Sequence, residues 1–401
     1  MNRRSISSLA VFLGFISTTG LGTAPAQAPL NTLSAAEKKA GWTLLWDGVD
    51  KFAEWKIGEN GGANSNSWII DNGALRSPNL NTMLFSKKTF SNFEWSLEWK
   101  LSKGGNSGLF IRVVNPPGWY CSGFEYAILD DESGGDRVEV SKNAADRLSN
   151  GKMAYIKRTG SVYDLYPTTR DGMIGGQYYD STFAKKFDEW NQGVVWANGT
   201  FLEHWLNGKK VVDAVIGSTE WTNRYRNSKF YPQCGDQFSL RPSGMLGLQD
   251  HGSGLIISIR NVKIRVITPG EKLVSPLVTP AGGTFAGPVK LTLEAAITGS
   301  VIRYTLDGSD PTETSPIYKD SLMMVRSATL KSATFRARFP TSDVVTSTFT
   351  ITGSGILAPA RLLPEYPVLG KFFYRLDGKR LNLPILSPEA LNLPGYQPIR
   401  E

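Results

Sequence analysis

The strictest pattern in this sequence is the alternation of apolar and polar side chains over residues 93–99. One face carries Phe93, Trp95, Leu97 and Trp99, and the other carries Glu94, Ser96 and Glu98. A period of two residues is that of a half-buried β-strand and does not fit an amphipathic helix. Similar runs recur at residues 108–114, 124–129, 194–196, 201–206 and 255–266. Gly, Asn or Asp separates many of them, which predicts an antiparallel sandwich.

Glycine and proline are frequent, with 41 Gly and 22 Pro among 401 residues. Both residue types favour turns, so long uninterrupted helices are not expected. The best short helix covers residues 33–40, where Glu37 follows Ser34 by three positions in a capping-box pattern. These patterns together predict an all-β fold.

Reactive and aromatic residues are distributed unevenly along the chain. All 11 Trp, both His and both Cys precede residue 252, so we expect the chemistry in the N-terminal part. A Pro/Gly/Thr-rich stretch at 269–278 is the predicted linker between a domain at 29–268 and a small β domain at 279–351. Residues 352–401 are rich in proline and lack periodicity, so we expect a tail of extended structure.

The N-terminus has the parts of a secretory signal peptide. Arg3 and Arg4 are basic, residues 9–16 are apolar but too short to span a bilayer, and small residues end at Ala28. We expect cleavage before Pro29 and export to the periplasm, the cell surface or the extracellular space. No later segment is apolar enough to suggest a membrane span.

Charge and cysteine content limit the classes of partner. The chain has 44 Lys and Arg against 36 Asp and Glu, a net charge of +8, but the two signs alternate instead of forming a basic stripe. Nucleic-acid binding is therefore not expected. In an exported protein, Cys121 and Cys234 are compatible with one disulfide and equally with two buried thiols. Cys and His occur singly and never at zinc-site spacing, so we expect no structural zinc site.

Six stretches of the first domain form an ordered set of motifs. They are LSAAEKKAGWTLLWDG (33–48), FEWSLEWKLSKGGNSGLFIRV (93–113), FEYAILDD (124–131), YDLYP (163–167), EHWLNGKKVV (203–212) and GLQDHGSGLIISIRNVKIR (247–265). Together they resemble the 3-keto-disaccharide hydrolase domain family. Residues 283–293 and 302–318 are similar to the chitobiase/β-hexosaminidase C-terminal domain. The resemblance implies a concanavalin-like (jelly-roll) β-sandwich followed by a small Ig-like β-sandwich.

The same resemblance implies a carbohydrate substrate already oxidised to a ketone at carbon 3. The carbonyl acidifies the proton on carbon 2, so a base can remove it, the glycosidic oxygen on carbon 1 leaves, and water adds back. This chemistry needs a base, an enolate stabiliser and an acid. It also implies a functional link to a sugar 3-oxidoreductase that makes the ketone. Retaining glycosidases instead need two closely spaced carboxylates, and residues 124–132 lack the Glu-x-Asp-x-x-Glu pattern.

Three residues are the predicted proton-transfer groups. His251 lies in a glycine-flanked turn, and imidazole titrates near neutral pH. His204 lies on a predicted strand before the Asn207-Gly208 turn. A turn histidine and a hydrogen-bonded sheet histidine are the structural alternatives for these two residues. Glu125 is preferred to Asp130, because strand alternation places the two carboxyls on opposite faces.

Six further residues are predicted to bind substrate. Four are polar and two are aromatic, the aromatic rings being suited to stacking on sugar faces: Arg112, Asn106, Gln249, Asp250, Trp119 and Trp205. For Arg112 a surface ion pair is the alternative, and most tryptophans are expected in the core. The sequence identifies no cofactor, although a divalent metal could assist at the ketone, and no metal ligands can be assigned. A non-catalytic, lectin-like protein is the alternative function, because this fold also serves lectins.

Overall fold

The computed structural model describes residues 29–58, 68–114, 119–132, 141–142, 146, 154, 156–169, 183–237 and 241–353. The predicted signal peptide and nearly all of the predicted tail lie outside these ranges. No helix among the described residues is long and apolar enough to cross a membrane.

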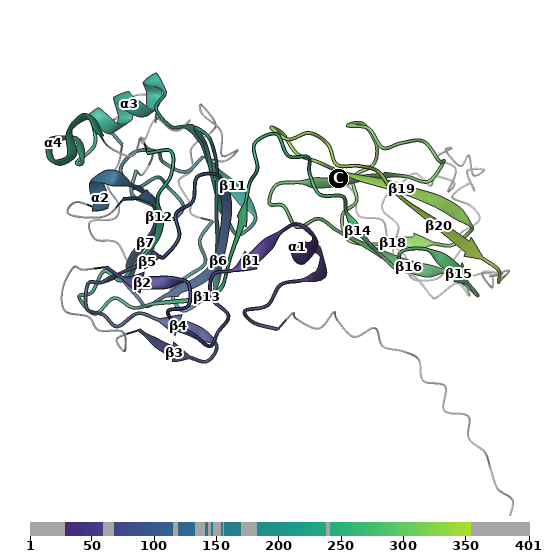
Figure 1. The fold of residues 1–401 in the computed structure, drawn as a ribbon, viewed down its shortest axis with the longest axis horizontal. Helices are drawn as coiled ribbons and strands as arrows, with labels where there is room; N and C mark the ends of the chain where they lie inside the picture. Colours follow the sequence, from purple (N-terminus) through teal and green to yellow (C-terminus); the bar gives the residue numbers. More distant parts are fainter. Residues whose placement is uncertain are drawn as a thin grey trace, which may run out of the picture. The chain divides into compact units, whose positions relative to one another are not determined.

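Two antiparallel sheets form the first domain (Figure 1). Sheet A has the order β11-β10-β9-β6-β13-β4-β3, with β1 also paired to β13, and sheet B has the order β2-β5-β12-β7-β8. The sheet A strands are β1 (Trp42–Leu44), β3 (Ile69–Asp71), β4 (Ala74–Arg76), β6 (Phe93–Leu101), β9 (Asn191–Asn198), β10 (Phe201–Leu206), β11 (Lys209–Val215) and β13 (Ile257–Val266). The sheet B strands are β2 (Trp55–Ile57), β5 (Met83–Ser86), β7 (Asn106–Val113), β8 (Phe124–Leu129) and β12 (Met245–Gln249). The predicted all-β sandwich is confirmed.

Short helices complete this domain. They are α1 (Ala35–Lys39), α2 (Trp119–Ser122), α3 (Thr219–Arg226) and α4 (Tyr231–Cys234), and the last three gather at one end of the sandwich (Figure 1). The predicted capping box of α1 is confirmed, because Glu37 N donates to Ser34 Oγ at 3.1 Å and Ser34 N donates to Glu37 Oε2 at 2.9 Å. A disulfide joins Cys121 of α2 to Cys234 of α4, which answers the question that the sequence left open.

One continuous apolar core fills the space between sheets A and B. Its largest members include buried tryptophans from both sheets, from α3 and from the residue before β3: Trp55, Trp95, Trp99, Trp221 and Trp68. The strand predicted at residues 93–99 is confirmed as β6, but Glu94 and Ser96 of its polar face are buried as well, and Glu98 is half-buried. Thr298 N donates to Glu94 Oε1 at 2.8 Å, so the outer face of sheet A is covered where a solvent-exposed face was expected.

The second domain is a pair of small sheets. One has the order β14-β16-β18 and the other β15-β20-β19-β17. Their strands are β14 (Leu277–Thr279), β15 (Gly283–Phe285), β16 (Val289–Glu294), β17 (Val301–Thr305), β18 (Leu322–Met324), β19 (Ala328–Phe335) and β20 (Val345–Ile351). A separate apolar core around Leu291, Leu330 and Phe349 holds them together. Strand β14 already begins within the predicted linker.

Charged residues connect the second domain to the outer face of sheet A. Arg336 Nη2 lies 2.7 Å from Glu203 Oε2, and Arg338 contacts both Glu203 and Asp213 at 2.8 Å. The Arg336 and Glu203 side chains are 3% and 5% exposed, so this ion pair is removed from solvent. Trp42 Nε1 also donates to the carbonyl of Ala296 at 2.9 Å. The two sandwiches therefore share buried polar contacts.

Candidate functional site

The outer face of sheet B carries the candidate site, and strand alternation decides which side chains reach it. On β8, Phe124 and Tyr126 point into the core, so the intervening Glu125 points outward. Leu248 of β12 is likewise a core residue, and the next residue, Gln249, faces out with Glu125. Phe110 is paired directly with Glu125 across β7 and β8. This outward face is therefore built by three neighbouring strands.

Gly108 makes room for the Glu125 carboxyl. A Cβ atom at Gly108 would lie 2.3 Å from Glu125 Oε1 and 2.6 Å from its Cγ, so the side chain occupies the space that glycine leaves empty. Gly108 is paired with Ala127, the residue two places beyond Glu125 on β8. The glutamate side chain thus lies across the sheet surface instead of projecting into solvent.

Burial changes the acidity of this carboxyl. Glu125 is 9% exposed, and desolvation raises its pKa from the ordinary value of 4.5 to about 8, while the positive charge of Lys229 acts in the opposite direction. A carboxyl with a pKa near neutrality exchanges protons at physiological pH, which an ordinary surface glutamate does not. Perturbed acids of this kind concentrate at functional sites.

A cavity of about 280 Å³, here called the Glu125 cavity, lies above this surface. Its lining comes from sheet B, from α2 and from the segment that enters α4: Phe110, Tyr120, Glu125, Lys229, Phe230, Gln233 and Gln249. Tyr120 and Gln233 directly precede the two cysteines of the disulfide. The disulfide therefore fixes two sides of the cavity relative to each other.

Lys229 is held by its aromatic neighbours. Its Nζ lies 4.5 Å from the ring centroid of Tyr163 and 5.2 Å from that of Phe230, and its backbone N–H donates to Asp164 Oδ2 at 2.7 Å. Cation–π contacts of this kind orient an ammonium group. Tyr163 N in turn donates to the carbonyl of Glu125 at 2.9 Å, so the lysine and the glutamate are connected through one turn.

Next to this cavity, the outer face of sheet B becomes apolar. Met83, Phe85, Phe110, Val113 and Met245 form a small cluster, each at most 5% exposed. Phe110 belongs both to this cluster and to the cavity lining. The cavity therefore has an apolar side, a charged group and a carboxyl, a combination typical of small-molecule sites.

The structure brings some predicted site residues to this face. Glu125 and Gln249 line the cavity, and Asn106 lies on the same strand and the same face as Phe110. Asp250 is fully buried, and its carboxylate accepts N–H groups from Leu80 at 2.7 Å and from Gly252 at 3.3 Å. Asp250 therefore shapes the turn after β12.

His251 lies in that turn, two residues beyond Gln249. It is partly buried and is not among the lining residues of the Glu125 cavity. The turn uses left-handed backbone at Gly252, Ser253 and Gly254, which explains its glycines. The role of His251 as a proton-transfer group therefore stays a prediction.

The structure places His204 and Trp205 on sheet A, away from the Glu125 cavity. His204 is fully buried, its Nδ1 lies 3.0 Å from the carbonyl oxygen of Gly160, and its ring packs 4.7 Å from that of Tyr126. Desolvation lowers the pKa of His204 to about 4, so it is neutral at physiological pH. Trp205 Nε1 donates to Glu203 Oε2 at 2.9 Å on the outer face of sheet A.

Arg112 has backbone partners. It is 3% exposed, has a left-handed φ of 55°, and donates to the carbonyls of Ser91 and Gly199. The guanidinium ties β7 to loops of sheet A, so it does not form the alternative surface ion pair. The side chain of Trp119 lies outside the described part of the structure.

Sequence reasoning missed the residues that come from the α3–α4 segment. Lys229, Phe230 and Gln233 lie in no strand-like pattern, and only the fold brings them to Glu125. One signal was present: Tyr120 and Gln233 each precede a cysteine. Pairing Cys121 with Cys234 would have placed both residues together.

Within the described ranges, no group of three or more His, Cys, Asp and Glu side chains could hold a metal ion. Among the described residues that line the Glu125 cavity, Glu125 is the only acid. The arrangement can therefore donate or accept a proton and stabilise negative charge, and the described lining holds one carboxylate where a retaining glycosidase needs two.

Comparisons with known proteins identify both domains. Residues 41–265 match the 3-keto-alpha-glucoside-1,2-lyase-like domain, and residues 280–346 match the chitobiase/beta-hexosaminidase C-terminal domain. A 3-keto-disaccharide hydrolase of Bacteroides thetaiotaomicron is 25% identical over 274 residues, which cover 60% of this chain and 83% of that protein.

Solved structures are also similar to part of this chain. A candidate glycosyl hydrolase from Parabacteroides distasonis is 28% identical, with coverage of 60% of this chain and 100% of that chain and a TM-score of 0.48. A beta-glucanase of Bacillus licheniformis is 10% identical, with coverage of 55% and 94% and a TM-score of 0.28.

Proposed function

Because the chain belongs to the 3-keto-alpha-glucoside-1,2-lyase-like family, we propose that it cleaves 3-keto-glycosides in the Glu125 cavity by elimination and hydration. The observation that carries the proposal is a single buried carboxyl, with a pKa raised to about 8, in a cavity that also holds Lys229. One titratable acid beside one cation suits proton abstraction next to a ketone.

In the proposed reaction, ionised Glu125 removes the proton from carbon 2 of the sugar. The C–H electron pair forms the enolate with carbon 3, and the ammonium group of Lys229 stabilises the negative oxygen. Collapse of the enolate forms the C1–C2 double bond and breaks the C1–O bond, and the departing oxygen takes a proton. Water then adds its oxygen to carbon 1 and a proton to carbon 2, giving the free 3-keto sugar.

Other lining residues have binding roles in this proposal. Gln249 hydrogen-bonds a sugar hydroxyl, and the rings of Tyr120 and Phe230 offer surfaces for the C–H face of the sugar. Tyr120 is 38% exposed, so part of its ring is accessible to a ligand. His251 is a second candidate for proton transfer. If it has this role, kcat of the His251→Asn variant should be at least about 10-fold lower than that of the wild type.

The test compares 3-keto-glucosides with their unoxidised parents, with and without a chelator. We expect release of the aglycone from the keto compounds alone and its loss in Glu125→Gln, with Glu189→Gln, an exposed acid, as the matched control. Sensitivity to the chelator would reveal a divalent metal. Cleavage of the unoxidised parents would contradict the elimination mechanism, and glycan binding without turnover would favour the lectin-like alternative.

The proposed reaction consumes a ketone that this chemistry does not make. We therefore propose that a sugar 3-oxidoreductase supplies the substrate. We also propose export, because residues 1–28 have the features of a signal peptide. N-terminal sequencing of the protein from culture fractions should give a mature start near Pro29, and an intact N-terminus in the cytoplasm would contradict export.

A further inference from the structure

Two connections between the sheets, next to the Glu125 cavity, are hydrogen-bonded to each other. Residues 77–82, here called the first crossing loop, lead from β4 of sheet A to β5 of sheet B. Residues 250–256, the second crossing loop, lead from β12 of sheet B back to β13 of sheet A. Gln249 lines the cavity and is the last residue of β12. Contacts that fix the start of the second crossing loop therefore also fix Gln249 at the cavity.

Asp250 joins the two crossing loops. It is fully buried, and its carboxylate accepts the N–H of Leu80 in the first loop at 2.7 Å and the N–H of Gly252 in the second loop at 3.3 Å. Its own N–H donates to the carbonyl of Thr82 at 2.8 Å. Burial of a carboxylate is unfavourable unless hydrogen bonds compensate it, and backbone N–H groups of both loops provide this compensation. Asp250 therefore holds both loops to the end of β12.

A second buried side chain holds Gln249 itself. Ser107 of β7 is 1% exposed, and its hydroxyl donates to the carbonyl of Gln249 at 2.7 Å. Leu248 is the last residue of β12 that pairs with β7, so this hydroxyl binds a carbonyl beyond the strand pairing. The carbonyl of Gln249 and the N–H of the next residue, Asp250, are thus both hydrogen-bonded. Little freedom is left to the backbone from which the Gln249 side chain reaches the cavity.

The two crossing loops also approach each other closely. The N–H of Gly254 donates to Asn79 Oδ1 at 2.6 Å, and a Cβ atom at Gly252 would lie 2.9 Å from the backbone nitrogen of Asn81. Asn79, Asn81 and Ser253 have left-handed φ values of 63°, 57° and 58°, which are uncommon for residues other than glycine. Uncommon backbone conformations persist where surrounding contacts impose them, and they concentrate at functional sites. The contacts between the loops therefore impose one arrangement beside the cavity.

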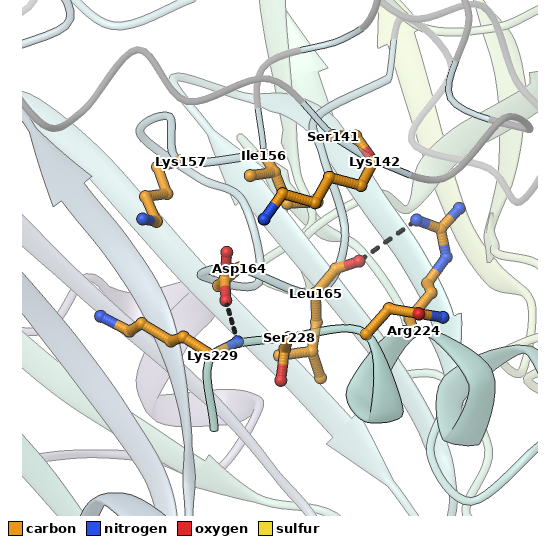
Figure 2. A pocket seen from close by; sticks show the side chains of 10 residues that line it. Ser141, Lys142, Ile156, Lys157, Asp164, Leu165, Arg224, Ser228 and Lys229 are labelled. Atoms are coloured by element: carbon orange, nitrogen blue, oxygen red, sulfur yellow. Dashed lines mark hydrogen bonds between the residues drawn. The ribbon is translucent and has the colours of Figure 1, made fainter. Parts of the chain in front are cut away.

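Lys229, another polar residue of the cavity lining, is supported in a similar way. Figure 2 shows its backbone N–H donating to the carboxylate of Asp164, a contact of 2.7 Å. Neither Asp164 nor Asp250 is among the described residues that line the Glu125 cavity. In both cases a carboxylate outside the lining fixes the backbone of the element that carries a lining side chain.

We propose that Asp250 and Ser107 are positioning residues, which hold the side chain of Gln249 where it meets a hydroxyl of the sugar. The inference rests on the proposed function of the Glu125 cavity. In this role Asp250 acts through Gln249 and not by contact with the substrate. Because Gln249 binds a hydroxyl that takes no part in bond breaking, its displacement should weaken the ground state and the transition state alike.

The test measures kcat and KM for 3-keto-glucosides. In Asp250→Asn, KM should rise by at least about 5-fold while kcat changes by less than about 3-fold, which is the pattern for a lost binding contact. The amide keeps the size of the carboxylate but presents an NH₂ donor to a backbone N–H that needs an acceptor. Ser107→Ala should show the same pattern with a smaller rise in KM. It also keeps the inference testable if Asp250→Asn does not fold.

Two further comparisons separate positioning from a purely structural role. In a Gln249→Ala protein, the added Asp250→Asn change should alter KM by less than about 2-fold, because residues that act through one contact are not additive. Ser77→Ala is the matched control, since Ser77 is a buried serine whose hydroxyl accepts the N–H of Ile257 at 3.1 Å, where the loops meet β4 and β13. It should lower the urea midpoint of unfolding as Ser107→Ala does, but leave KM unchanged.

An unchanged KM in the folded Asp250→Asn and Ser107→Ala proteins would overturn the inference. So would effects of Asp250→Asn and Gln249→Ala on KM that simply multiply, or an equal rise in KM in Ser77→Ala. A wild-type protein that cleaves no 3-keto-glucoside would instead remove the proposed function, and the inference with it.

Discussion

At the residue scale, ionisation of Glu125 should raise activity and lower stability as the pH increases. A base must be ionised, so kcat/KM should rise with pH through about 8, the pKa of Glu125 in the free protein. The unfolded chain loses this proton near 4.5, so the free energy of unfolding should fall as pH rises from about 4.5 to about 8.

Glu125→Gln should abolish the activity. It should also abolish the fall in the free energy of unfolding between pH 4.5 and pH 8, because glutamine does not ionise. At pH 8 the variant should be more stable than the wild type, by at most about 5 kcal/mol, and at pH 4.5 the two should be similar. Urea unfolding at both pH values checks this difference. A variant that is less stable at pH 8 would mean that Glu125 is ionised and well paired in the native protein.

Gly108 positions Glu125, because the absence of a Cβ atom at Gly108 leaves room for the glutamate side chain. In Gly108→Ala, the new methyl group would lie 2.3 Å from Glu125 Oε1 and 2.6 Å from its Cγ, so the glutamate side chain from Cγ outwards would have to move. We expect a loss in kcat of about 100-fold for a displaced proton-transfer group, with little change in thermal stability. Gly287→Ala, whose Cβ would meet nothing within 4 Å, is the control. Full activity in Gly108→Ala would argue against a role for Glu125.

At the element scale, α2 and α4 are too short to be stable alone. Each has four residues, and the Cys121–Cys234 disulfide joins them across 113 positions of sequence. Replacing both cysteines with alanine should lower the free energy of unfolding by about 2–5 kcal/mol. It should also raise KM more than it lowers kcat, because Tyr120 and Gln233 would lose their fixed spacing while Glu125 stays on β8. An unchanged KM would show that the helices hold the cavity without the bond.

The elements also show what the sequence could and could not predict. Alternation located β6 and β8 because a period of two is a local property, and it selected Glu125 for the outward face. It could not place Arg112, whose left-handed φ turns the side chain towards backbone carbonyls of sheet A. Nor could it find Lys229, which reaches Glu125 only through the turn at Tyr163 and the packing of α3 and α4.

At the scale of the whole molecule, contacts with the second sandwich bury charged residues on the outer face of sheet A. Arg336 connects to Glu203 with both side chains nearly inaccessible, and the positive charge of Arg336 also acts on the fully buried Glu94. Burial raises the pKa of Glu94, while Arg265 and Arg336 oppose that change. Removing Arg336 therefore takes away a positive charge that compensates both Glu203 and Glu94.

Arg336→Met should accordingly cost about 3–5 kcal/mol of unfolding free energy at pH 7. The loss should shrink in acid, because burial raises the pKa of Glu94 and a protonated Glu94 no longer needs the cation. Arg338→Met is the matched control: Arg338 contacts the same Glu203, but its side chain is 31% exposed, so its loss should be smaller. Denaturant unfolding of the full chain measures both variants. Equal losses would mean that the exposure of the two arginines does not decide their effect. A loss confined to Arg336→Met would show that buried charges between the two sandwiches stabilise the protein.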